Sequence, residues 1–372
     1  MQVTVIASYA LFPADNGGRR AITLLHQALN QYVKVQILTV ENGKPPENYR
    51  VEVLPVLGKS IWRYLNPKLP SRIYQYMLAA NSRHLIIEHP YMGWAGVWLK
   101  RTKGIQLTIR SHNIESLRFR TLGKWWWGIL WNYEKWVHRH ADVNWFITDE
   151  DRTWAVSHYR LKPAKCYTIS YGVEQNQPPA DDARHAARKR IQSEHHIAPD
   201  ARILLFAGVL NYAPNQQAVQ HIIEHLYPKI NNAQQPFHIL ICGRHLPQSM
   251  QDAIKKLDSN ITYTGFVPDI VPYYLGADVF LNPVLEGGGI KTKILEALES
   301  GLTVVSTKTG AAGVSDVLTG DKLYIAEDNN WDQFSNYVLN AKDSQKISVE
   351  FYKSFNWSNI ARKAADTLKE LH

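Results

Sequence analysis

The chain has 372 residues, of which 45% are apolar and 20% are charged, an ordinary balance for a soluble globular protein. No run of about 18 uncharged apolar residues occurs, which excludes a membrane-spanning helix. Two cysteines, Cys166 and Cys242, are too few for a disulfide scaffold or a cysteine-based zinc site. This length exceeds one comfortable hydrophobic core, so we expect two domains. The N-terminus, MQVTVIASYALFPADNGG, lacks the charged front and the cleavage site of a signal peptide, so we expect a cytoplasmic protein.

Positive charge is concentrated in the first half of the chain. Residues 1–172 carry 23 Lys and Arg against 11 Asp and Glu, a net charge of +12, whereas residues 173–372 carry 19 against 22, a net charge of −3. A basic half indicates an anionic partner, such as a membrane surface, a nucleic acid or an acidic substrate. A general contribution to solubility is the alternative interpretation.

Short apolar runs alternate along the chain with amphipathic segments of helical length. We predict strands at residues 3–8, 33–40, 51–56, 84–88, 105–111, 143–148, 166–170, 202–208, 237–243, 261–265, 278–283, 303–307 and 323–326. Continuous apolar strands separated by helices are typical of buried parallel sheets. The pattern restarts near residue 202, after a polar stretch from Glu174 to Asp200. We therefore predict the α/β class, with two doubly wound, Rossmann-like domains at residues 1–172 and 173–356.

Two strand ends in the first half carry candidate functional residues. IIEHPYMGW (86–94) places His89, and SHNIESLRFR (111–120) places His112 and Glu115, at the sheet edge where α/β proteins bind ligands. Ser111 is a candidate cap for the helix that follows. For His89, a packed or solvated loop histidine is the alternative.

The segment KWWWGILWNYEKWVHRH (124–140) holds five of the twelve tryptophans. Trp prefers the water–lipid interface, and Lys and Arg attract anionic headgroups. We therefore expect contact with an anionic membrane, peripheral on the inner face of the plasma membrane. An ordinary helix with aromatic packing is the alternative. Nucleic acid is a rival partner, but no recognised module is present, so no nucleic-acid partner is predicted.

Two short patterns resemble metal sites. HIIEH (221–225) matches the H-x-x-E-H spacing of a metalloprotease, but no third ligand is indicated. DED (149–151) resembles an Asp-x-Asp metal motif, yet Thr148 and Asp151 together form a helix start. We therefore predict no metal site.

NPVLEGGGIKTKILEALESG (282–301) is the most informative stretch of the sequence. A buried strand stops at Pro283, three glycines permit positive φ and close backbone approach, and a helix is predicted from about Ile290. Its apolar residues share one face, whereas Lys293 and Glu296 project away from that face. A strand, a glycine loop and a positive helix end with added cations form a phosphate-binding arrangement. The spacing of a Walker loop is absent, and a flexible turn with a solvated helix face is the alternative.

GGGIKTKILEALESGLTVVST, followed by GAAGVSD, resembles the signature of the GT-B glycosyltransferases, specifically the retaining enzymes of glycosyltransferase family 4. The resemblance covers nearly the whole chain and is weakest in residues 41–83. The other matching segments are ADNGG (14–18), SYGVE (170–174), FAGVLNYAPN (206–215), ICG (241–243), TGFVPDIVPYY (264–274) and SFNWSNIA (354–361).

The resemblance implies a GT-B fold in which a nucleotide-diphosphate sugar binds in an interdomain cleft, without a metal or a cofactor. It implies that the C-terminal helix, 357–372, crosses back onto the first domain. It also implies that Glu296 holds the ribose hydroxyls, that Lys291 and Lys293 bind the diphosphate, and that His89 points at the transferred sugar. His89, Lys291 and Glu296 are thus the candidate catalytic residues, and His112 and Glu115 are acceptor-side candidates. The candidate donor-binding residues are Gly17, Gly18, Gly208, Asn211, Gly243, Phe266, Val267, Glu286, Gly288, Gly289, Lys291, Lys293 and Glu296.

The sequence departs from the family pattern in two places. The family has two Glu separated by seven residues, and the first of these positions is Gly288 here, with Glu286 two residues out of register. Many members carry cations just after the glycine of FAG, whereas none follows Gly208 until Lys229. The predicted function is transfer of a hexose-type sugar to a glycan or lipid-linked acceptor, in the synthesis of a cell-envelope polysaccharide or glycolipid. A nucleotide-sugar epimerase of the same fold and a non-catalytic glycan- or partner-binding scaffold are the alternatives.

Overall fold

The computed structural model describes residues 1–41, 43–233, 235–257, 259–287, 289–314, 316–341 and 346–371. The chain divides into two compact units, which are described separately. Unit 1 comprises Met1–Gly172 and Phe355–His372, and unit 2 comprises Val173–Ser354.

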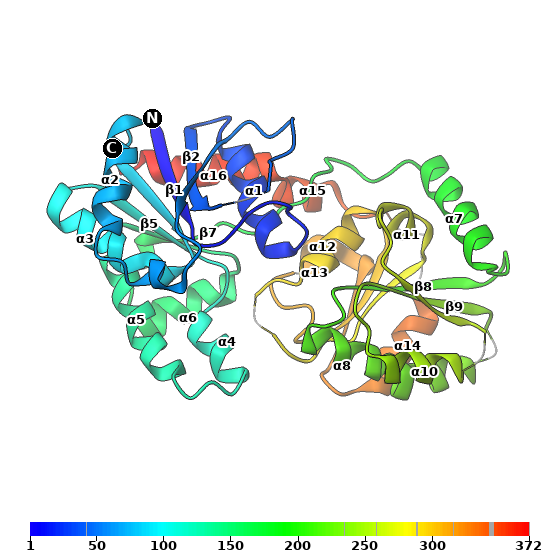
Figure 1. Cartoon of the computed structure of the whole chain (residues 1–372). Helices are drawn as coiled ribbons and strands as arrows, with labels where there is room; N and C mark the ends of the chain where they lie inside the picture. Colours follow the sequence, from blue (N-terminus) through cyan, green and yellow to red (C-terminus); the bar gives the residue numbers. More distant parts are fainter. Residues whose placement is uncertain are drawn as a thin grey trace. The chain divides into compact units, whose positions relative to one another are not determined.

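Unit 1 is built on a seven-stranded sheet with the order β3-β2-β1-β4-β5-β6-β7, in which neighbouring strands pair in parallel (Figure 1). The chain moves outward from β1 to β3 and then returns to β4, so the strand order reverses between β1 and β4. Ligands of doubly wound sheets bind outside the carboxyl ends of the strands at such a switch point. The strands are β1 (Gln2–Ala7), β2 (Lys34–Val40), β3 (Glu52–Leu57), β4 (His84–Glu88), β5 (Gln106–Ser111), β6 (Val143–Phe146) and β7 (Cys166–Thr168).

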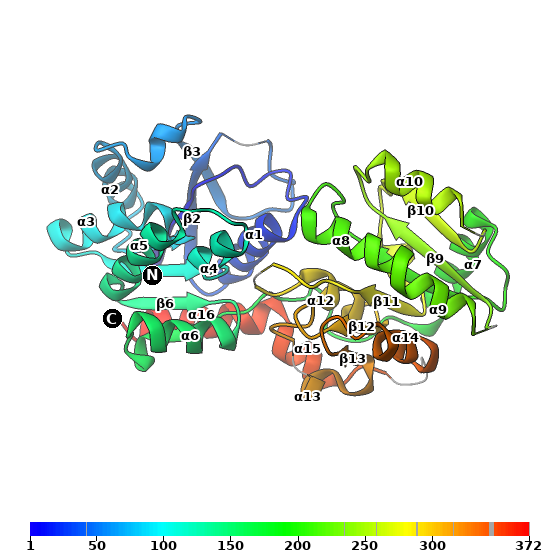
Figure 2. The same cartoon turned by 90° about the horizontal axis from the view of Figure 1, so that it is seen from below.

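Helices cover both faces of this sheet. Helices α2, α3 and α5 share one core cluster with strands β1 to β5. Helix α16 packs on the opposite face beside α1, where the Trp145 indole N–H donates to Thr367 Oγ1 at 3.0 Å; Figure 2 shows β6 between α5 and α16. The helices are α1 (Gly17–Leu29), η1 (Ile61–Tyr64), α2 (Leu69–Ala79), η2 (Pro90–Met92), α3 (Gly93–Lys103), α4 (Glu115–Thr121), α5 (Trp127–His140), α6 (Asp149–Tyr159), η3 (Pro163–Lys165) and α16 (Trp357–Lys369).

Unit 2 repeats the plan with a six-stranded parallel sheet of order β10-β9-β8-β11-β12-β13, whose switch point lies between β8 and β11. Helices α8, α10 and α14 share a core cluster with one face of the sheet. On the other face, the Tyr274 ring of α11 lies 5.7 Å from the Phe280 ring of β11. The strands are β8 (Arg202–Ala207), β9 (Phe237–Cys242), β10 (Ile261–Gly265), β11 (Val279–Asn282), β12 (Thr303–Thr307) and β13 (Leu323–Ala326).

Helical segments connect these strands. They are α7 (Asp181–His195), α8 (Ala213–His221), the π-helix η4 (Ile222–Leu226), α9 (Tyr227–Asn231), α10 (Gln248–Lys255), α11 (Val271–Gly276), α12 (Thr292–Glu299), α13 (Asp316–Thr319), η5 (Gly320–Lys322), α14 (Trp331–Asn340) and α15 (Val349–Phe355).

The predicted fold class is confirmed, because both sheets are parallel and doubly wound. Each predicted strand is present, with ends that differ from the prediction by at most two residues. Strands buried on both faces produce continuous apolar runs, such as the five buried residues of β4, and such runs are recognisable in the sequence. Within the described ranges, no helix is long and apolar enough to cross a membrane.

Gly243 provides a stability test for the switch point of unit 2. A Cβ added to Gly243 would lie 1.9 Å from the carbonyl oxygen of Gly208 and 2.9 Å from Leu210 Cγ. The backbone oxygen cannot rotate away, so Gly243→Ala should lower the free energy of unfolding by roughly 3 kcal/mol. Urea denaturation measures this change.

Gly128→Ala is the matched control for the Gly243 variant. A Cβ at Gly128, in helix α5, would meet no atom within 4 Å. This variant should raise the free energy of unfolding by up to about 1 kcal/mol, because Ala is the better helix former. Equal effects of the two substitutions would contradict the close approach at Gly243.

Candidate active site

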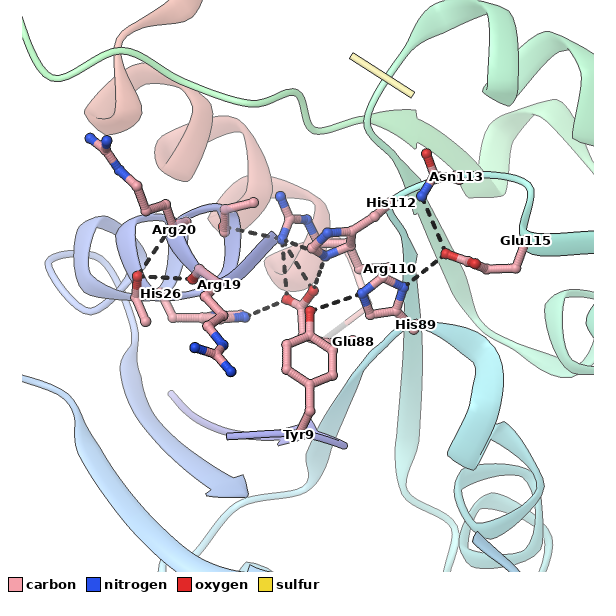
Figure 3. A network of polar contacts seen from close by, with 12 residues as sticks. Tyr9, Arg19, Arg20, His26, Glu88, His89, Arg110, His112, Asn113 and Glu115 are labelled. Carbon is pink, nitrogen blue, oxygen red and sulfur yellow. Dashed lines mark hydrogen bonds and ion pairs between the residues drawn. The ribbon is translucent and has the colours of Figure 1, made fainter. Parts of the chain in front are cut away.

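Unit 1 gathers polar side chains where strands β1, β4 and β5 end (Figure 3). Ala7, Glu88 and Arg110 are register partners across these strands, so their side chains point to the same face of the sheet. Tyr9 follows β1 and His89 directly follows β4, on either side of the switch point. The strand order therefore brings together residues far apart in the sequence.

Glu88 is the charged centre of this group. Its carboxylate is fully buried; it accepts from His26 Nε2 and His112 Nε2 at 2.6 Å each and from Arg110 Nη1 at 3.1 Å. Burial by itself would raise the pKa of Glu88, but the Arg110 charge and the two histidine hydrogen bonds outweigh it and hold the pKa well below the usual range. The ionised carboxylate therefore links α1, β4 and β5 at this edge.

His89 is held from several sides. Its Nδ1 lies 3.2 Å from Glu115 Oε1, its Nε2 lies 3.1 Å from the Tyr9 hydroxyl, and its ring stacks on His112 with 4.1 Å between centroids. Its backbone has φ 62° and ψ 147°, a conformation that side-chain-bearing residues rarely adopt, and its N–H donates to Arg110 O at 2.8 Å. Such strain costs on the order of 1–3 kcal/mol and clusters at functional sites. His89 therefore has the geometry of a functional residue.

His112 and Glu115, the acceptor-side candidates, lie beside His89. Burial, together with the charges of His89 and Arg110, lowers the pKa of His112 to about 3, so its ring is neutral at pH 7. Burial raises the pKa of Glu115, but the hydrogen bond from His89 and the Arg118 charge outweigh this effect and bring the pKa to about 2. The side chains of both residues point into the group around His89, and their contact with an acceptor stays a prediction.

Helix α4 is not capped by Ser111, so that expectation was wrong. Ser111 Oγ instead bonds to His138 Nε2 at 2.9 Å. The first N–H groups of the helix, those of Glu115 and Ser116, donate to the Glu134 carboxylate at 2.9 and 2.8 Å. Glu134 belongs to helix α5, which packs against α4, and local sequence spacing gives no signal for such a cap.

Gly17 and Gly18 begin helix α1, next to the switch point of unit 1. Asn16 caps the helix by accepting from the Arg19 N–H at 3.0 Å. A Cβ at Gly18 would lie 3.7 Å from the Tyr9 hydroxyl, which itself contacts His89. Tyr9 therefore connects the first glycine loop to His89. Sequence reasoning missed Tyr9, because only the strand order places it beside His89.

In unit 2, backbone contacts tie Gly208 and Gly243 together. The Gly208 N–H donates to Cys242 O at 3.0 Å, and the Gly243 N–H donates to Gly265 O at 2.8 Å. Both glycines lie beyond the carboxyl ends of adjacent strands, which permits the backbones to approach closely. The N–H groups of both glycines are thus bonded within the protein, and the absence of side chains lets the loops after β8 and β9 come together.

Arg244 supplies a cation that sequence reasoning missed. The Leu210 N–H donates to Arg244 O at 2.9 Å, so Arg244 lies beside the loop that follows Gly208. Its guanidinium lies 3.6 Å from the centroid of the Phe266 ring, a cation–π contact at a ring that is 54% exposed. The predicted donor residues Asn211 and Phe266 are exposed, and Val267 is half-buried. The loop that follows β9 thus carries a cation whose backbone lies beside the loop after Gly208.

Lys291 closes the glycine loop after β11. Its Nζ donates to Gly287 O at 2.6 Å and to Gly289 O at 3.3 Å. A Cβ at Gly287 would lie 3.4 Å from the Tyr212 hydroxyl, so the loops that follow β8 and β11 face each other across the switch point. Glu286 is exposed. Gly288, the family's first Glu position, lies outside the described residues.

Helix α12 begins at Thr292, two residues later than predicted, with Lys291 at the N-cap position. Glu296 is only 9% exposed, and Lys293, its predicted neighbour three residues earlier, contacts its carboxylate. Its Oε2 accepts from Lys293 Nζ at 2.7 Å and from the Tyr274 hydroxyl at 3.3 Å. Tyr274 comes from α11, which the helical periodicity of α12 could not anticipate.

The two metal-like patterns have structural explanations. The HIIEH segment ends in π-helix η4, and the His225 ring stacks on Trp331 at 5.3 Å. Thr148 Oγ1 accepts from the Asp151 N–H at 3.1 Å, as predicted for a helix start. Across the part of the chain that is described, no group of three or more His, Cys, Asp and Glu side chains is placed to hold a metal ion.

The Trp-rich segment is mostly packed as a helix. Trp125 is 84% exposed and Ile129 is 67% exposed, whereas the Trp131 ring packs on Tyr159 with 5.8 Å between centroids. The most exposed apolar side chains of this segment therefore lie around the start of α5, and Trp136, further along the helix, is 36% exposed.

Two doubly wound parallel sheets, each with polar groups at its switch point, define the GT-B class of protein. Residues 16–177 match the family model described as Glycosyltransferase Family 4. Residues 201–343 match the model described as Glycosyl transferases group 1. The two matches together cover most of the chain, which belongs to the GT-B glycosyltransferases, as the resemblance predicted.

Solved structures share the fold over the whole chain. Sucrose-phosphate synthase from Thermosynechococcus elongatus aligns with a TM-score of 0.75 at 14% identity, over 100% of this chain and 99% of that chain. Anabaena Alr3699/HepE in complex with UDP aligns with a TM-score of 0.74 at 13% identity, over 100% of both chains. A curated relative, an uncharacterized 44.6 kDa protein in the cps region of Klebsiella pneumoniae, is 27% identical over 172 residues. That match spans 45% of this chain and 43% of the relative.

The strain at His89 predicts an inverted order of stability for two variants. His89→Gly should have a free energy of unfolding at least about 1 kcal/mol higher than that of His89→Ala, because Gly relieves the positive-φ strain and Ala keeps it. His185, exposed within helix α7, is the control. There the Ala variant should be more stable than the Gly variant by about 1 kcal/mol. Urea denaturation of the four variants measures both differences. If the Ala variant were more stable than the Gly variant at both positions, the strain at His89 would be contradicted.

The buried charges of unit 1 predict a loss of stability in acid. The pKa of His112 is about 3, against an ordinary value of 6.5, and the pKa values of Glu88 and Glu115 are also lowered, so all three groups bind more protons in the unfolded chain. The free energy of unfolding should therefore fall as the pH falls below about 6.5. His112 alone contributes a slope of about 1.4 kcal/mol per pH unit between its two pKa values.

Urea denaturation between pH 7.5 and pH 4 measures this dependence. His112→Gln keeps an N–H donor for Glu88 and removes the titrating ring, so its slope should be shallower than that of the unmodified protein. His185→Gln is the matched control, and its slope should equal that of the unmodified protein. If the free energy of unfolding of His112→Gln depended on pH as steeply as that of the unmodified protein, the conclusion that the His112 ring is neutral would be contradicted.

Proposed function

We propose that this protein is a retaining glycosyltransferase. It transfers a hexose-type sugar from a nucleotide-diphosphate sugar to a glycan or lipid-linked acceptor. The observation that carries the proposal is a glycine loop, two lysines and a buried Glu, which lie together where β11 ends and α12 begins. Glycines and cations suit a diphosphate, and a carboxylate suits the hydroxyls of a ribose. Family membership supports the proposal, as does a structural neighbour that binds UDP.

The proposed diphosphate site uses Lys291, Lys293 and Arg244. Two backbone carbonyls hold the Lys291 ammonium in place, and the Phe266 ring holds the Arg244 guanidinium. Cations fixed before the reaction stabilise the charge that develops on a nucleoside diphosphate as the glycosidic bond breaks. The proposal therefore requires no metal and no cofactor, and it places the glycine loops at Gly208 and Gly243 next to the nucleotide.

Glu296 is the proposed ribose ligand. Lys293 and Tyr274 both hold one of its oxygens, Oε2, and this fixes the orientation of the carboxylate. A carboxylate that is already oriented loses little conformational entropy when it accepts hydrogen bonds from two neighbouring hydroxyls.

His89 is the proposed contact with the transferred sugar. Glu115 fixes its Nδ1, which sets the direction in which Nε2 points, towards the Tyr9 hydroxyl. A sugar hydroxyl can join this chain of hydrogen bonds as a donor or as an acceptor. Glu115 and Tyr9 act through His89 in this proposal and are positioning residues.

The acceptor and the location are also part of the proposal. A glycan or lipid-linked acceptor in the synthesis of a cell-envelope polysaccharide or glycolipid accords with the relative in the cps region. We place the protein in the cytoplasm, peripheral on the inner face of the plasma membrane, in accord with the basic charge of unit 1.

Replacing Glu296 tests the donor site. A panel of UDP, GDP, ADP and CDP is first screened for stabilisation of the folded protein, because a ligand that binds the folded state raises its melting midpoint. Calorimetry with the best nucleotide should then show binding by Glu296→Ala that is about 10-fold to 100-fold weaker, the loss expected for hydrogen bonds to a charged group. Glu327→Ala, which removes an exposed carboxylate of unit 2, should bind as the unmodified protein does.

Product analysis decides between transfer and the alternatives. With the matching sugar nucleotide and a glycan acceptor, a new glycoside with the donor's anomeric configuration should form, as seen by NMR. An epimerised sugar nucleotide formed from donor alone would favour the epimerase. The absence of binding to all four nucleotides would favour a non-catalytic scaffold, and unchanged binding in Glu296→Ala would overturn the ribose assignment.

A further inference from the structure

The η1 turn of unit 1 exposes an apolar tip that the proposed donor and sugar sites do not use. Ile61 is 74% exposed, and Trp62 and Leu65 are each 71% exposed. Three large apolar side chains within five positions are directed to solvent, although a single turn of this kind has no need of them for packing. A contiguous apolar patch at the surface of a soluble domain marks an interaction site.

The chain around this tip is basic, and the acidic residue recorded beside it is Glu41, which pairs with Lys59 at 2.7 Å. Residues 53–87 contain five Lys and Arg and no Asp or Glu. Lys68 and Arg72 are exposed, and neither forms an ion pair with any described residue. Arg63 is used to hold the turn, because it donates to Ser8 O at 3.1 Å and to Lys59 O at 2.7 Å. The charge beside the apolar tip therefore suits an anionic surface.

A hollow of about 440 Å³ lies under the tip. Trp62 and Leu65 form its apolar wall, and Arg72 and Asn66 provide polar groups at its lining. A guanidinium beside an apolar wall matches a phosphate group that carries an apolar chain, since guanidinium binds phosphate oxygens through parallel N–H groups.

A second tip of the same composition lies at the turn between α4 and α5. Leu122 is 43% exposed, Trp125 is 84% exposed and Ile129 is 67% exposed, with exposed Arg120 just before Leu122 and exposed Lys124 next to Trp125. This turn follows β5, and η1 follows β3, so both belong to connections that leave the carboxyl edge of the sheet.

The η1 tip is also connected to the surroundings of His89. Arg63 binds the carbonyl of Ser8, the residue before Tyr9. The Tyr64 ring packs on Tyr91 with 6.3 Å between centroids, and Tyr91 in turn donates to Glu115 at 2.7 Å. A surface that contacts η1 would therefore lie on the same side of unit 1 as the proposed sugar contact.

We propose that unit 1 docks on an anionic phospholipid surface through the η1 tip and the α4–α5 tip. Trp62, Leu65 and Trp125 enter the interface, and Lys68 and Arg72 bind the phosphates of the headgroups. The docking itself does not depend on the proposed function. Its consequence does rest on that function: docking would bring a lipid-linked acceptor to the edge of the sheet that carries His89. In this proposal the Trp-rich segment contributes through Trp125, just before α5, and η1 is the principal contact.

A lipid surface fits this tip better than a soluble glycan or a protein partner. Ile61 and Leu65 offer neither a flat stacking face nor a hydrogen bond to a sugar, whereas both gain from burial among acyl chains. A protein partner would need acidic residues to match the charge, and the tip alone is smaller than a stable protein interface.

Vesicle flotation of the full chain tests the docking. The protein should float with vesicles of phosphatidylcholine and phosphatidylglycerol in a 3:1 ratio, and pure phosphatidylcholine should bind it at least about 10-fold more weakly. Raising the NaCl concentration to 0.5 M should weaken the binding. Trp62→Ser/Leu65→Ser should weaken the partition at least about 10-fold, because each side chain loses its burial in the interface. Arg72→Gln should weaken it about 5-fold, the effect of one cation near the surface.

Val317→Ser is the matched control, because it removes an 87% exposed apolar side chain from unit 2. Its partition should equal that of the unmodified protein. Circular dichroism and the nucleotide screen monitor folding and unit 2, and both should be unchanged in every docking variant. Vesicle binding without any nucleotide binding would leave the docking standing and reject the proposed transferase function.

Several outcomes would overturn the docking. These are equal binding to neutral and anionic vesicles, no binding to either, and undiminished binding in Trp62→Ser/Leu65→Ser. Binding of soluble polygalacturonate that the same variants abolish would assign the tip to an acidic glycan instead. Self-association of the chain that these variants abolish, without vesicle binding, would assign it to an interface between copies.

Discussion

A buried negative charge, the Glu88 carboxylate, constrains the whole functional edge of unit 1. A carboxylate without access to water is costly unless cations and hydrogen-bond donors compensate it, and removal of one partner of such a pair typically costs about 3–5 kcal/mol. Arg110 and two histidines supply that compensation from a neighbouring strand, a loop and helix α1. These elements can adopt few other arrangements, because any shift would leave the charge unpaired. His112 is fixed in this way, and the ring of His89 stacks on it. The strained backbone of His89 is thus maintained by interactions one residue away, at the end of β4.

The same topological rule locates the functional groups in both units. In each sheet the strand order reverses once, between β1 and β4 in unit 1 and between β8 and β11 in unit 2. The loops that follow these strands diverge to opposite faces and leave room for a ligand between them. Tyr9 and His89 occupy this place in one sheet, and the loops of Gly208 and Gly287 occupy it in the other. Glycines are needed in unit 2 because backbone itself lines the space there, whereas side chains fill the corresponding space in unit 1.

Much of this arrangement could be predicted from the sequence, and the failures have a common cause. Apolar runs locate the strands because burial on both faces demands them, and the glycine loop with its lysines is recognisable by local spacing. Periodicity within one helix placed Glu296 off the apolar face of α12, but it cannot foresee that Tyr274 of another helix covers that position. Arg244 and Tyr9 were missed for the same reason, because each becomes a neighbour of the site only through strand order. The Glu134 cap of α4 likewise comes from a helix that follows it. Features that depend on local spacing can therefore be predicted from the sequence. Contacts between residues of different helices and strands can be identified only once the fold is known.

The two units use charge in different ways, and the difference follows from what each must do. In unit 1 the charges of Glu88 and Arg110 are buried and paired, so their main effect is to hold the surroundings of His89 in one geometry. In unit 2, Arg244 is exposed and lies against a neutral aromatic ring, Lys291 is held by backbone carbonyls, and Lys293 is partly exposed and paired with Glu296. A cation that binds a diphosphate must keep its charge accessible to the ligand. A cation that holds the scaffold together is neutralised by a carboxylate of the protein. The basic tips of unit 1 belong to the first kind: Lys68 and Arg72 stay in water beside apolar side chains that packing does not require. A protein that places unpaired charge next to exposed Trp in this way is suited to a partner that is anionic and apolar at once.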